Sequence, residues 1–259
     1  MSKLLAGKRI LLTNDDGIYA PGLKVLEAIA HELSDDVWVV APETEQSATS
    51  HSLTLHDPLR MRELSERRYA VKGTPTDCVM MAIKHLLKDD LPDLVLSGVN
   101  RGQNMAEDVT YSGTIAAAME GILLGVPSIA LSQVFGLNSK SPPWPVAEAH
   151  GAKIIARLVE TGWPANVLLN VNFPDVEPDS VSGVKVSVQG RREQFLLNVI
   201  ERTDGRNVPY YWFGFNRKRF DPPQGTDLHA VYNGSISVTP LHLDLTHGET
   251  VSALKGALE

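Results

Sequence analysis

Residues 9–23, with the sequence RILLTNDDGIYAPGL, decide the fold class of this chain. The apolar run RILLT at 9–13 has the length of a buried strand, and Pro21 suits the first turn of a helix, where its missing N–H is not needed. Behind it, apolar residues recur at helical spacing: Leu23, Leu26, Ile29, Ala30 and Leu33. A second apolar run, DVWVVA, follows at 36–41. The succession of strand, helix and strand predicts a βαβ unit in a parallel sheet.

The same alternation continues through the first half of the chain. We expect strands at 93–97 (DLVLS) and 127–132 (PSIALS), and helices at 76–87 and 113–124. This pattern is typical of an α/β fold with three layers, in which helices cover both faces of a doubly wound, mostly parallel, Rossmann-like sheet. We assign residues 1–135 to this core.

The second part of the chain, residues 136–259, is expected to complete the sheet. It begins with a loop rich in proline and serine at 136–145. Its predicted elements are a helix at 148–161, strands at 167–173 and 234–239, and a terminal helix at 249–258.

Residues 189–227 are interpreted as a long β-hairpin arm. The turn signal TDGR at 203–206 separates two segments that favour strands. The second segment is strongly aromatic: Tyr210, Tyr211, Trp212, Phe213 and Phe215. A free two-stranded hairpin with so apolar a surface is not stable in water, so two arrangements are open. The arm docks either on a second subunit, which would give a homo-oligomer, or within an ordinary intrachain sheet.

The composition excludes several classes of protein. The chain has 259 residues, 43% apolar and 21% charged, which is typical of a globular protein and not of a disordered one. Twenty-four Lys and Arg against 31 Asp and Glu give a net charge of -7, which argues against a nucleic-acid duplex as partner. No apolar run approaches the roughly 18 residues of a membrane span, and no signal peptide is expected. The single cysteine, Cys78, rules out an intrachain disulfide and favours a cytoplasmic location.

The adjacent aspartates Asp15 and Asp16 are the strongest candidates for chemistry. They follow Asn14 at the carboxyl end of the first predicted strand, where open α/β sheets bind their ligands. Adjacent carboxylates repel each other, and a hard divalent cation would offset that repulsion. Gly17 permits the tight turn that aims both side chains inward. The alternative is that one of the aspartates caps the following helix.

A second polar loop, residues 41–54, follows the second predicted strand and is dense in hydroxyl groups. Ser47 could supply an oxygen ligand from this loop. His51 could contact substrate or transfer a proton, although an ordinary surface histidine is the alternative.

A third polar segment, residues 97–104, leaves another predicted strand. Asn100 and Asn104 stand there beside two glycines, a composition that suits a cage of oxygen atoms. The helix that follows begins with three candidate phosphate ligands: Ser112, Gly113 and Thr114. Hydroxyls and free N–H groups at a helix start suit a phosphate, and N-capping is the alternative. Because the three loops leave strands of one sheet at the same edge, we expect them to converge.

Other common sites are excluded by spacing. The sequence lacks GxGxxG after the first strand, the P-loop pattern GxxxxGK[ST], the GxSxG elbow and HExxH. Dinucleotide binding through the usual fingerprint, a P-loop and zinc hydrolysis are therefore disfavoured.

Four stretches carry a resemblance to a known family. In chain order they are LLTNDDGIYAPGL, VVAPETEQSATSHSLT, KGTPTDCV and DLVLSGVNRGQNMAEDVTYSGTIAAAMEG. They resemble the SurE (stationary-phase survival protein) family of metal-dependent 5'-nucleotidases. The later stretches PYYWFGF and GSISVTPLH also resemble that family's swapped hairpin arm and final strand.

The resemblance implies the following site. One divalent metal ion per subunit, Mg²⁺ or Mn²⁺, is bound by Asp15, Asp16, Ser47 and Asn100. Asn14, with the two aspartates, belongs to the catalytic group, and the phosphoryl group lies near Asn104, Ser112, Gly113 and Thr114. The implied substrates are nucleoside 5'-monophosphates and, in some members, polyphosphate, and the implied assemblies are dimers or tetramers. Ala48 and Ala106 stand where many members have glycine, which bears on the shape of the loops.

The expected reaction is hydrolysis of a phosphomonoester by a metal-activated water. One alternative within enzymes is a phosphatase in which an aspartate attacks phosphorus, although that chemistry usually has a DxD pattern and not an adjacent pair. An alternative from another class is a magnesium-binding phospho-receiver or nucleotide-sensing module without turnover. Such modules are generally about half this length.

Overall fold

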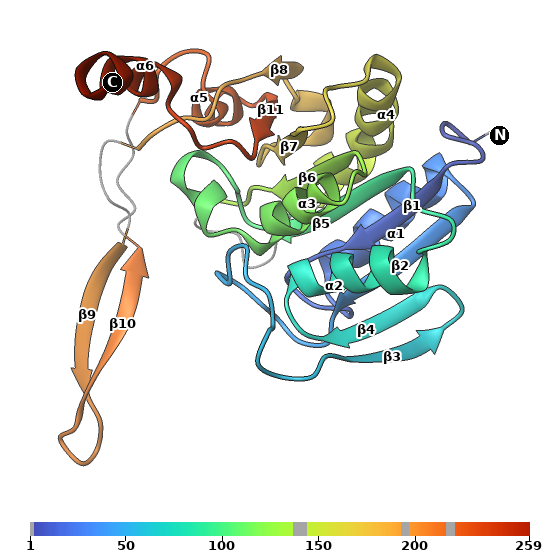
Figure 1. The fold of residues 1–259 in the computed structure, drawn as a ribbon, viewed down its shortest axis with the longest axis horizontal. Coiled ribbons are helices and arrows are strands. Elements are labelled where there is room, and N and C mark those ends of the chain that lie inside the picture. The colour runs from blue at the N-terminus through green and yellow to red at the C-terminus, as the bar shows by residue number, and fades with distance from the viewer. Residues whose placement is uncertain (1–2, 137–143, 193–196, 216–220) are drawn as a thin grey trace.

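The structure is a computed structural model and describes the chain apart from residues 1–2, 137–143, 193–196 and 216–220. Within the described residues, nine strands form one sheet with helices on both of its faces (Figure 1). The predicted α/β fold with a mostly parallel sheet is confirmed.

The order of the strands across the sheet is β3-β4-β2-β1-β5-β6-β7-β11-β8. Their bounds are β1 (Arg9–Thr13), β2 (Asp36–Pro42), β3 (Arg60–Ser65), β4 (Arg68–Lys72), β5 (Leu94–Arg101), β6 (Ser128–Gln133), β7 (Val167–Phe173), β8 (Val184–Val186) and β11 (Ile236–His242). The strands from β4 to β7 in this order are parallel, whereas β3 and β11 are antiparallel to β4 and β7. The chain passes from β1 to β2 on one side and later to β5 on the other. This reversal places a topological switch point at the carboxyl ends of β1 and β5, where open α/β sheets bind ligands.

Alternating side chains of the strands separate two cores. Ile10 and Leu12 of β1 pack in the same cluster as the apolar faces of α1 (Pro21–Leu33) and α4 (Pro145–Thr161). Leu11, between them, belongs to a second cluster with α2 (Pro75–Met81). Because successive residues of a strand point to opposite faces, the two clusters lie on opposite sides of the sheet. α3 (Gly113–Leu123) packs beside α2 (Figure 1).

Shorter elements complete the fold. A π-helical segment, Ala82–Leu86, follows α2, and α5 (Asp227–Tyr232) packs against β11 and β7. Two short 3-10 helices lie at Ala106–Thr110 and Pro178–Ser180.

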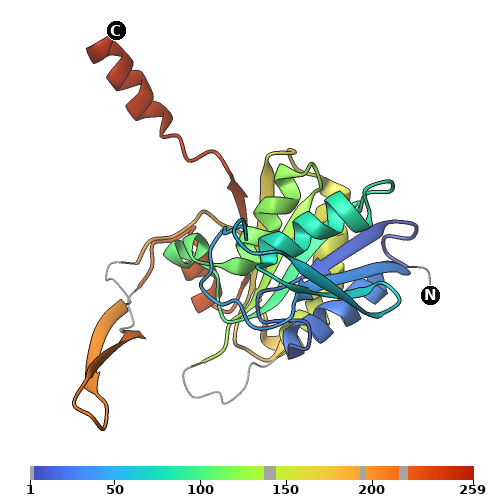
Figure 2. The same cartoon turned by 60° about the horizontal axis from the view of Figure 1, so that its bottom comes forward.

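Two elements project from the body of the molecule, as Figure 2 shows. The antiparallel hairpin of β9 (Leu197–Thr203) and β10 (Pro209–Phe215) stands apart from the nine-stranded sheet. The C-terminal helix α6 (Gly248–Leu258) extends in another direction and contains no buried residue. The intrachain alternative for the hairpin arm is therefore wrong within the described residues, because β9 and β10 pair only with each other.

The predicted elements match the observed ones with a few exceptions. The helix expected at 76–87 divides into α2 and the π-helical segment, and the hairpin strands occupy less of residues 189–227 than expected. The sequence interpretation missed β3, β4, β8 and α5. β3 (RMRELS) is largely exposed and charged and β8 (VKV) has three exposed residues, so neither has an apolar pattern. Most of the loop predicted at 136–145 lies outside the described residues.

Candidate active site

The candidate site lies beyond the carboxyl ends of β1 and β5. Thr13, the last residue of β1, pairs with Ser97 of β5. After an irregularity between Ser97 and Asn100, β5 continues to Arg101, paired with β6. Asn100 and Arg101 therefore extend past the end of β1, beside the loop that contains the two aspartates.

Asp15 is almost completely buried, with 5% of its surface exposed, and it contacts the start of α3. Its Oδ1 accepts a 2.6 Å hydrogen bond from the hydroxyl of Thr114. Gly113 lies so close that a Cβ atom on it would be 2.8 Å from the Cβ of Asp15. The absence of a side chain at Gly113 therefore allows α3 to approach the carboxylate.

Asp16 faces the neighbouring strand. Its Oδ2 accepts a 3.1 Å hydrogen bond from the backbone N–H of Arg101. The N-cap of α1 is Ala20, and no side chain caps that helix. The alternative in which Asp15 or Asp16 caps the following helix is therefore wrong.

Asn14 shapes the turn that presents the aspartates. It is 1% exposed, its Nδ2 donates to the carbonyl of Gly17 at 3.0 Å, and its Oδ1 accepts from the N–H of Gly17 at 3.3 Å. Gly17 has φ +102°, a backbone conformation that favours glycine, and a Cβ atom on it would be 3.4 Å from the backbone of Thr44 in the loop after β2.

The loop after β2 lies against both of the other polar segments. The N–H of Gln46 donates to the carbonyl of Asp15 at 2.7 Å, and the N–H of Ser50 donates to the carbonyl of Tyr111 at 3.3 Å. Ser47 is exposed beside them, and its hydroxyl donates to Oε1 of Glu45 at 2.7 Å. The expected convergence of the three loops is thus present.

Buried amides hold the segment after β5. The N–H of Asn104 donates to Oδ1 of Asn172 at 2.9 Å, and the Nδ2 of Asn170 donates to the carbonyl of Asn104 at 2.7 Å. The side chain of Asn104 donates to the hydroxyl of Ser132 at 2.9 Å. Strands β6 and β7 therefore position this residue. The sequence interpretation missed these partners, although two asparagines in the apolar run VLLNVNF are a signal of buried polar contacts.

Ser112 is the N-cap of α3, and its hydroxyl accepts a 3.1 Å hydrogen bond from the N–H of Ile115. The capping role considered from the sequence is therefore present. The first turn of a helix leaves backbone N–H groups without partners inside the helix, and they carry partial positive charge. The start of α3 thus points donors toward the region of Asp15.

Ala48 and Ala106 adopt left-handed backbone conformations, with φ of 60° and 53°. Glycine adopts this region without the steric cost that a Cβ atom adds. The backbone at both positions would therefore accept glycine more easily than the alanine that this chain has.

The two carboxylates have unusual electrostatics. Burial raises the pKa of Asp15 to about 6 from 3.8, the hydrogen bond from Thr114 opposes this, and the negative charge of Asp16 adds to it. Burial also raises the pKa of Asp16, while the N–H and the positive charge of Arg101 oppose the increase and Glu45 adds to it. Neither aspartate forms an ion pair with a described residue. The hydrogen bonds to the two carboxylates and the charge of Arg101 offset this buried negative charge only in part.

The residues present fit a hard divalent cation. In the part of the chain that the structure describes, no three or more His, Cys, Asp or Glu side chains are grouped as a metal site, so two carboxylates would need neutral partners. Asn100 has its Nδ2 bonded to the carbonyl of Gly102 at 3.0 Å, which leaves Oδ1 without a described partner. Carboxylate, amide and hydroxyl oxygens are the ligands that Mg²⁺ and Mn²⁺ favour.

His51 is exposed at the surface, as the alternative expected, but its ring contacts a buried carboxylate. Its Nε2 lies 3.0 Å from Oε2 of Glu120, a residue of α3 that is only 4% exposed. The same loop is further attached where Thr54 donates through its N–H and hydroxyl to Asp77. Asp77 also forms a capping box with Thr74 at the start of α2. Glu120 was missed in the sequence because a single glutamate in an alanine-rich helix resembles a solvated position.

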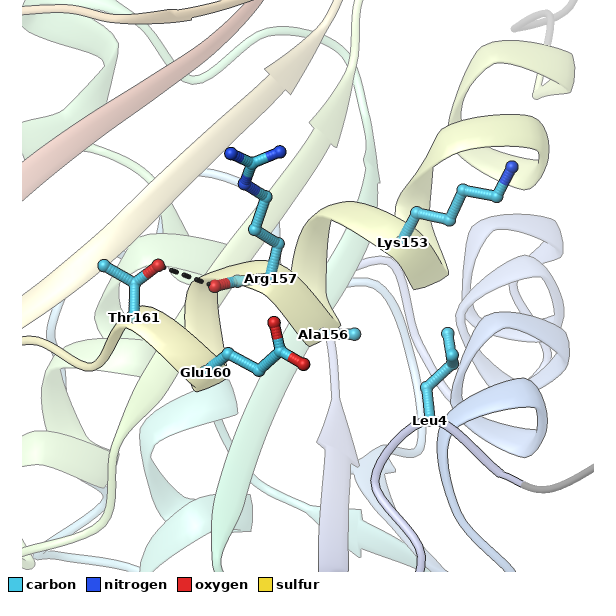
Figure 3. Close-up of a pocket in the computed structure, with 6 residues that line it drawn as sticks. All are labelled: Leu4, Lys153, Ala156, Arg157, Glu160 and Thr161. Carbon is cyan, nitrogen blue, oxygen red and sulfur yellow. Dashed lines mark hydrogen bonds between the residues drawn. The ribbon is translucent and has the colours of Figure 1, made fainter.

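Two hollows on the surface are separate from this site. Figure 3 shows the first, of about 530 Å³, which is lined by Leu4 of the N-terminal segment and by residues of α4: Lys153, Ala156, Arg157, Glu160 and Thr161. The second, of about 430 Å³, includes Lys8, Asp93 and Trp163 and lies at the amino ends of β1 and β5. None of the candidate residues lines either hollow.

Known proteins similar to this chain support one family. Residues 10–195 match the family model described as Survival protein SurE. The 5'-nucleotidase SurE of Parvibaculum lavamentivorans is 63% identical, over 96% of this chain and 91% of the relative. The 5'-nucleotidase SurE of Caulobacter vibrioides is 60% identical, over 96% of each chain. Among solved structures, the crystal structure of the Sure protein from Aquifex aeolicus matches with a TM-score of 0.83 and 40% identity, covering 97% of this chain and all of that one. The chain therefore belongs to the SurE family.

Proposed function

We propose that this chain is a 5'-nucleotidase that hydrolyses nucleoside 5'-monophosphates to a nucleoside and phosphate with the help of one divalent cation, Mg²⁺ or Mn²⁺. The proposal depends mainly on the buried Asp15, which lies beside Asp16 and is hydrogen-bonded to the first turn of α3. The names of relatives at 60% identity and above support the reaction class.

The proposed metal ligands are Asp15, Asp16, Ser47 and Asn100. When bound, such an ion lowers the pKa of a water and balances negative charge on the phosphoryl oxygens. Two carboxylates with neutral oxygens leave the ion electrophilic, because they do not over-neutralise its charge.

The rest of the chemistry belongs to the protein. The N–H groups at the start of α3, with Ser112, Gly113 and Thr114, bind and orient the phosphoryl group. Asn14 keeps the turn at Gly17 closed, so that both aspartates point to one place. Asn104, held by β6 and β7, lines the far side of the phosphoryl position. Because these donors are already oriented, little free energy is needed to reorient them when charge develops on the phosphoryl oxygens.

Assembly and location are further parts of the proposal. We place a homo-oligomer, a dimer or tetramer, at the hairpin arm, because its aromatic side chains are exposed on both faces. No helix in the described part of the chain is long and apolar enough to cross a membrane. The buried free thiol of Cys78 is compatible with the reducing cytoplasm that we propose.

The experiment is a rate profile for the purified protein with AMP, short-chain polyphosphate and p-nitrophenyl phosphate under Mg²⁺, Mn²⁺ and EDTA. We expect multiple turnovers with AMP that EDTA abolishes. A single turnover or none would favour the sensing module, and a trapped phospho-aspartate would favour direct attack by a carboxylate. Hydrolysis of polyphosphate would extend the substrate range to that polymer.

A further inference from the structure

Arg101 lies beside the candidate metal site, and its positive charge is not paired with a carboxylate of any described residue. Its side chain is exposed, and it forms no hydrogen bond or ion pair with any residue that the structure describes. Its backbone N–H is bonded to Asp16 at 3.1 Å, so the residue is attached directly to one of the two carboxylates.

An aromatic ring supports the guanidinium group. The central carbon of the Arg101 guanidinium lies 5.8 Å from the ring centre of Phe135, which follows β6. Gly102 lies against the same ring, because a Cβ atom there would be 3.9 Å from Phe135. An arginine held over an aromatic face loses fewer conformations on binding a ligand than a free side chain does.

The net charge of the proposed site indicates that a further positive group is needed near the phosphate. Asp15 and Asp16 together balance a divalent ion, and Glu45 adds a further negative charge that acts on Asp16. A phosphomonoester dianion entering this site would meet no net positive charge from the metal and its ligands alone. The backbone N–H of Arg101 is bonded to Oδ2 of Asp16 at 3.1 Å, so Arg101 lies at the edge of the proposed metal site. From this position its long side chain can reach a phosphate group bound at the metal.

We propose that Arg101, supported by Phe135, binds the phosphate group of the substrate from the side opposite to the start of α3. This inference rests on the proposed function and extends it by one phosphate-binding residue. A planar guanidinium donates two parallel hydrogen bonds to two phosphate oxygens, which a lysine cannot reproduce. The start of α3 and Arg101 would then hold the phosphoryl group between them.

The test compares Arg101→Met and Arg101→Lys with the wild type. For Arg101→Met we expect KM for AMP and for p-nitrophenyl phosphate to rise about 10- to 100-fold, because the substitution removes a hydrogen-bonded charge pair. The dissociation constant of inorganic phosphate, measured by calorimetry on the Mg²⁺-loaded protein, should rise by a similar factor. Arg101→Lys should recover only part of the loss. Phe135→Leu, which keeps the guanidinium but removes its support, should give a smaller increase of the same kind.

Arg157→Met is the matched control, because Arg157 is exposed on α4 beside the hollow of Figure 3 and away from the candidate site. It should leave both constants unchanged. The increase in melting temperature produced by Mn²⁺ should be kept in Arg101→Met. Loss of that increase would mean that the substitution damages the metal site, and it would overturn the inference.

Two further outcomes would refute the inference about Arg101, and a third would refute only the proposed function. A rise in KM for AMP without one for p-nitrophenyl phosphate would mean that Arg101 contacts the nucleoside. Unchanged KM and phosphate affinity in Arg101→Met, in a wild type that hydrolyses AMP, would refute the role of Arg101 and leave the proposed function intact. A wild type that does not hydrolyse AMP but binds phosphate through Arg101 would refute the function alone.

Discussion

The hydroxyl of Thr114 donates a 2.6 Å hydrogen bond to Oδ1 of Asp15, although the two residues are 99 positions apart. One residue follows the first strand of the sheet and the other lies in the first turn of α3. The bond joins the proposed metal ligand to the proposed phosphate-binding turn. A displacement of either element therefore changes both functions, and the predictions below begin from this contact.

Asp15→Asn should abolish turnover while making the metal-free protein more stable. An increase in the pKa from 3.8 to about 6 corresponds to roughly 3 kcal/mol of unfavourable free energy for the ionised carboxyl. An amide keeps an acceptor for Thr114 and removes the charge. We expect the melting temperature without metal to rise by about 2 °C or more, and the increase produced by Mn²⁺ to disappear. Thermal unfolding with and without Mn²⁺ measures both effects.

The control for this substitution is Asp57→Asn, at an exposed position after the loop that contains Ser47. It should change neither the melting temperature nor the response to Mn²⁺. Near-normal phosphatase activity of Asp15→Asn in added metal would refute the assignment of the site.

The stability gained by Asp15→Asn should depend on pH. The folded-state pKa of Asp15 lies above its unfolded value, so between roughly pH 4 and 6 the folded protein binds a proton that the unfolded chain has released. The contribution of this group to stability therefore falls as pH rises through about 6. Denaturant midpoints of the metal-free wild type and of Asp15→Asn should differ at pH 7.5 and approach each other at pH 5. Equal differences at both values would mean that the charge of Asp15 is not the cause.

Gly113→Ala should damage the site without breaking α3. An added Cβ atom would be 2.8 Å from the Cβ of Asp15 and 3.2 Å from its Oδ2, so the carboxylate or the helix must move. We expect kcat to fall about 100-fold and the free energy of unfolding to fall by about 1–3 kcal/mol. Gly256→Ala is the control, because an added Cβ meets open space there on α6. A fully active Gly113→Ala would show that the close approach is not needed.

The contact between His51 and Glu120 should stabilise the loop that includes Ser47. In His51→Ala the buried carboxylate of Glu120 loses its side-chain partner at 3.0 Å, and the free energy of unfolding should fall by about 1–3 kcal/mol. The double variant with Glu120→Gln should be less destabilised than the sum of the two single variants. Additive effects in a double-mutant cycle, measured by denaturant unfolding, would refute the coupling.

The hairpin arm should control the oligomeric state. Trp212 and Phe213 are 62% and 75% exposed, neighbouring positions on opposite faces of β10. Replacing both with serine should shift the protein toward monomer in size-exclusion chromatography with light scattering. Leu91→Ser, a comparable exposed apolar residue on another part of the surface, should leave the mass unchanged. An unchanged mass for the hairpin variant would place the interface elsewhere.

The parallel core was predictable because its strands are apolar on both faces. Arg9–Thr13 and Val167–Phe173 are buried between two helical layers, so most of their residues are apolar and they form short strand-like runs. Edge strands need not be apolar on both faces. β3 is mostly exposed, and nothing in RMRELS separates it from a charged loop. The sequence pattern therefore predicts the centre of the sheet better than its edges.

For the candidate site, the sequence indicated the positions but not the directions of side chains. The pair Asp15–Asp16 stood out through its charge and its place after a strand, and Thr114 stood out as a hydroxyl at the start of a helix. The bond between Asp15 and Thr114, and the one between His51 and Glu120, depend on how distant elements pack. Residue type alone could not reveal that Glu120 is buried, because glutamate is usually exposed on helices.

The place of β11 has a consequence for synthesis of the chain. β11 (Ile236–His242) lies between β7 and β8, and it forms only near the end of translation. Until then the outer edge of β7 exposes backbone groups that can pair with strands of other nascent chains. A truncated chain that ends before residue 236 would thus lack β11 and be prone to aggregation.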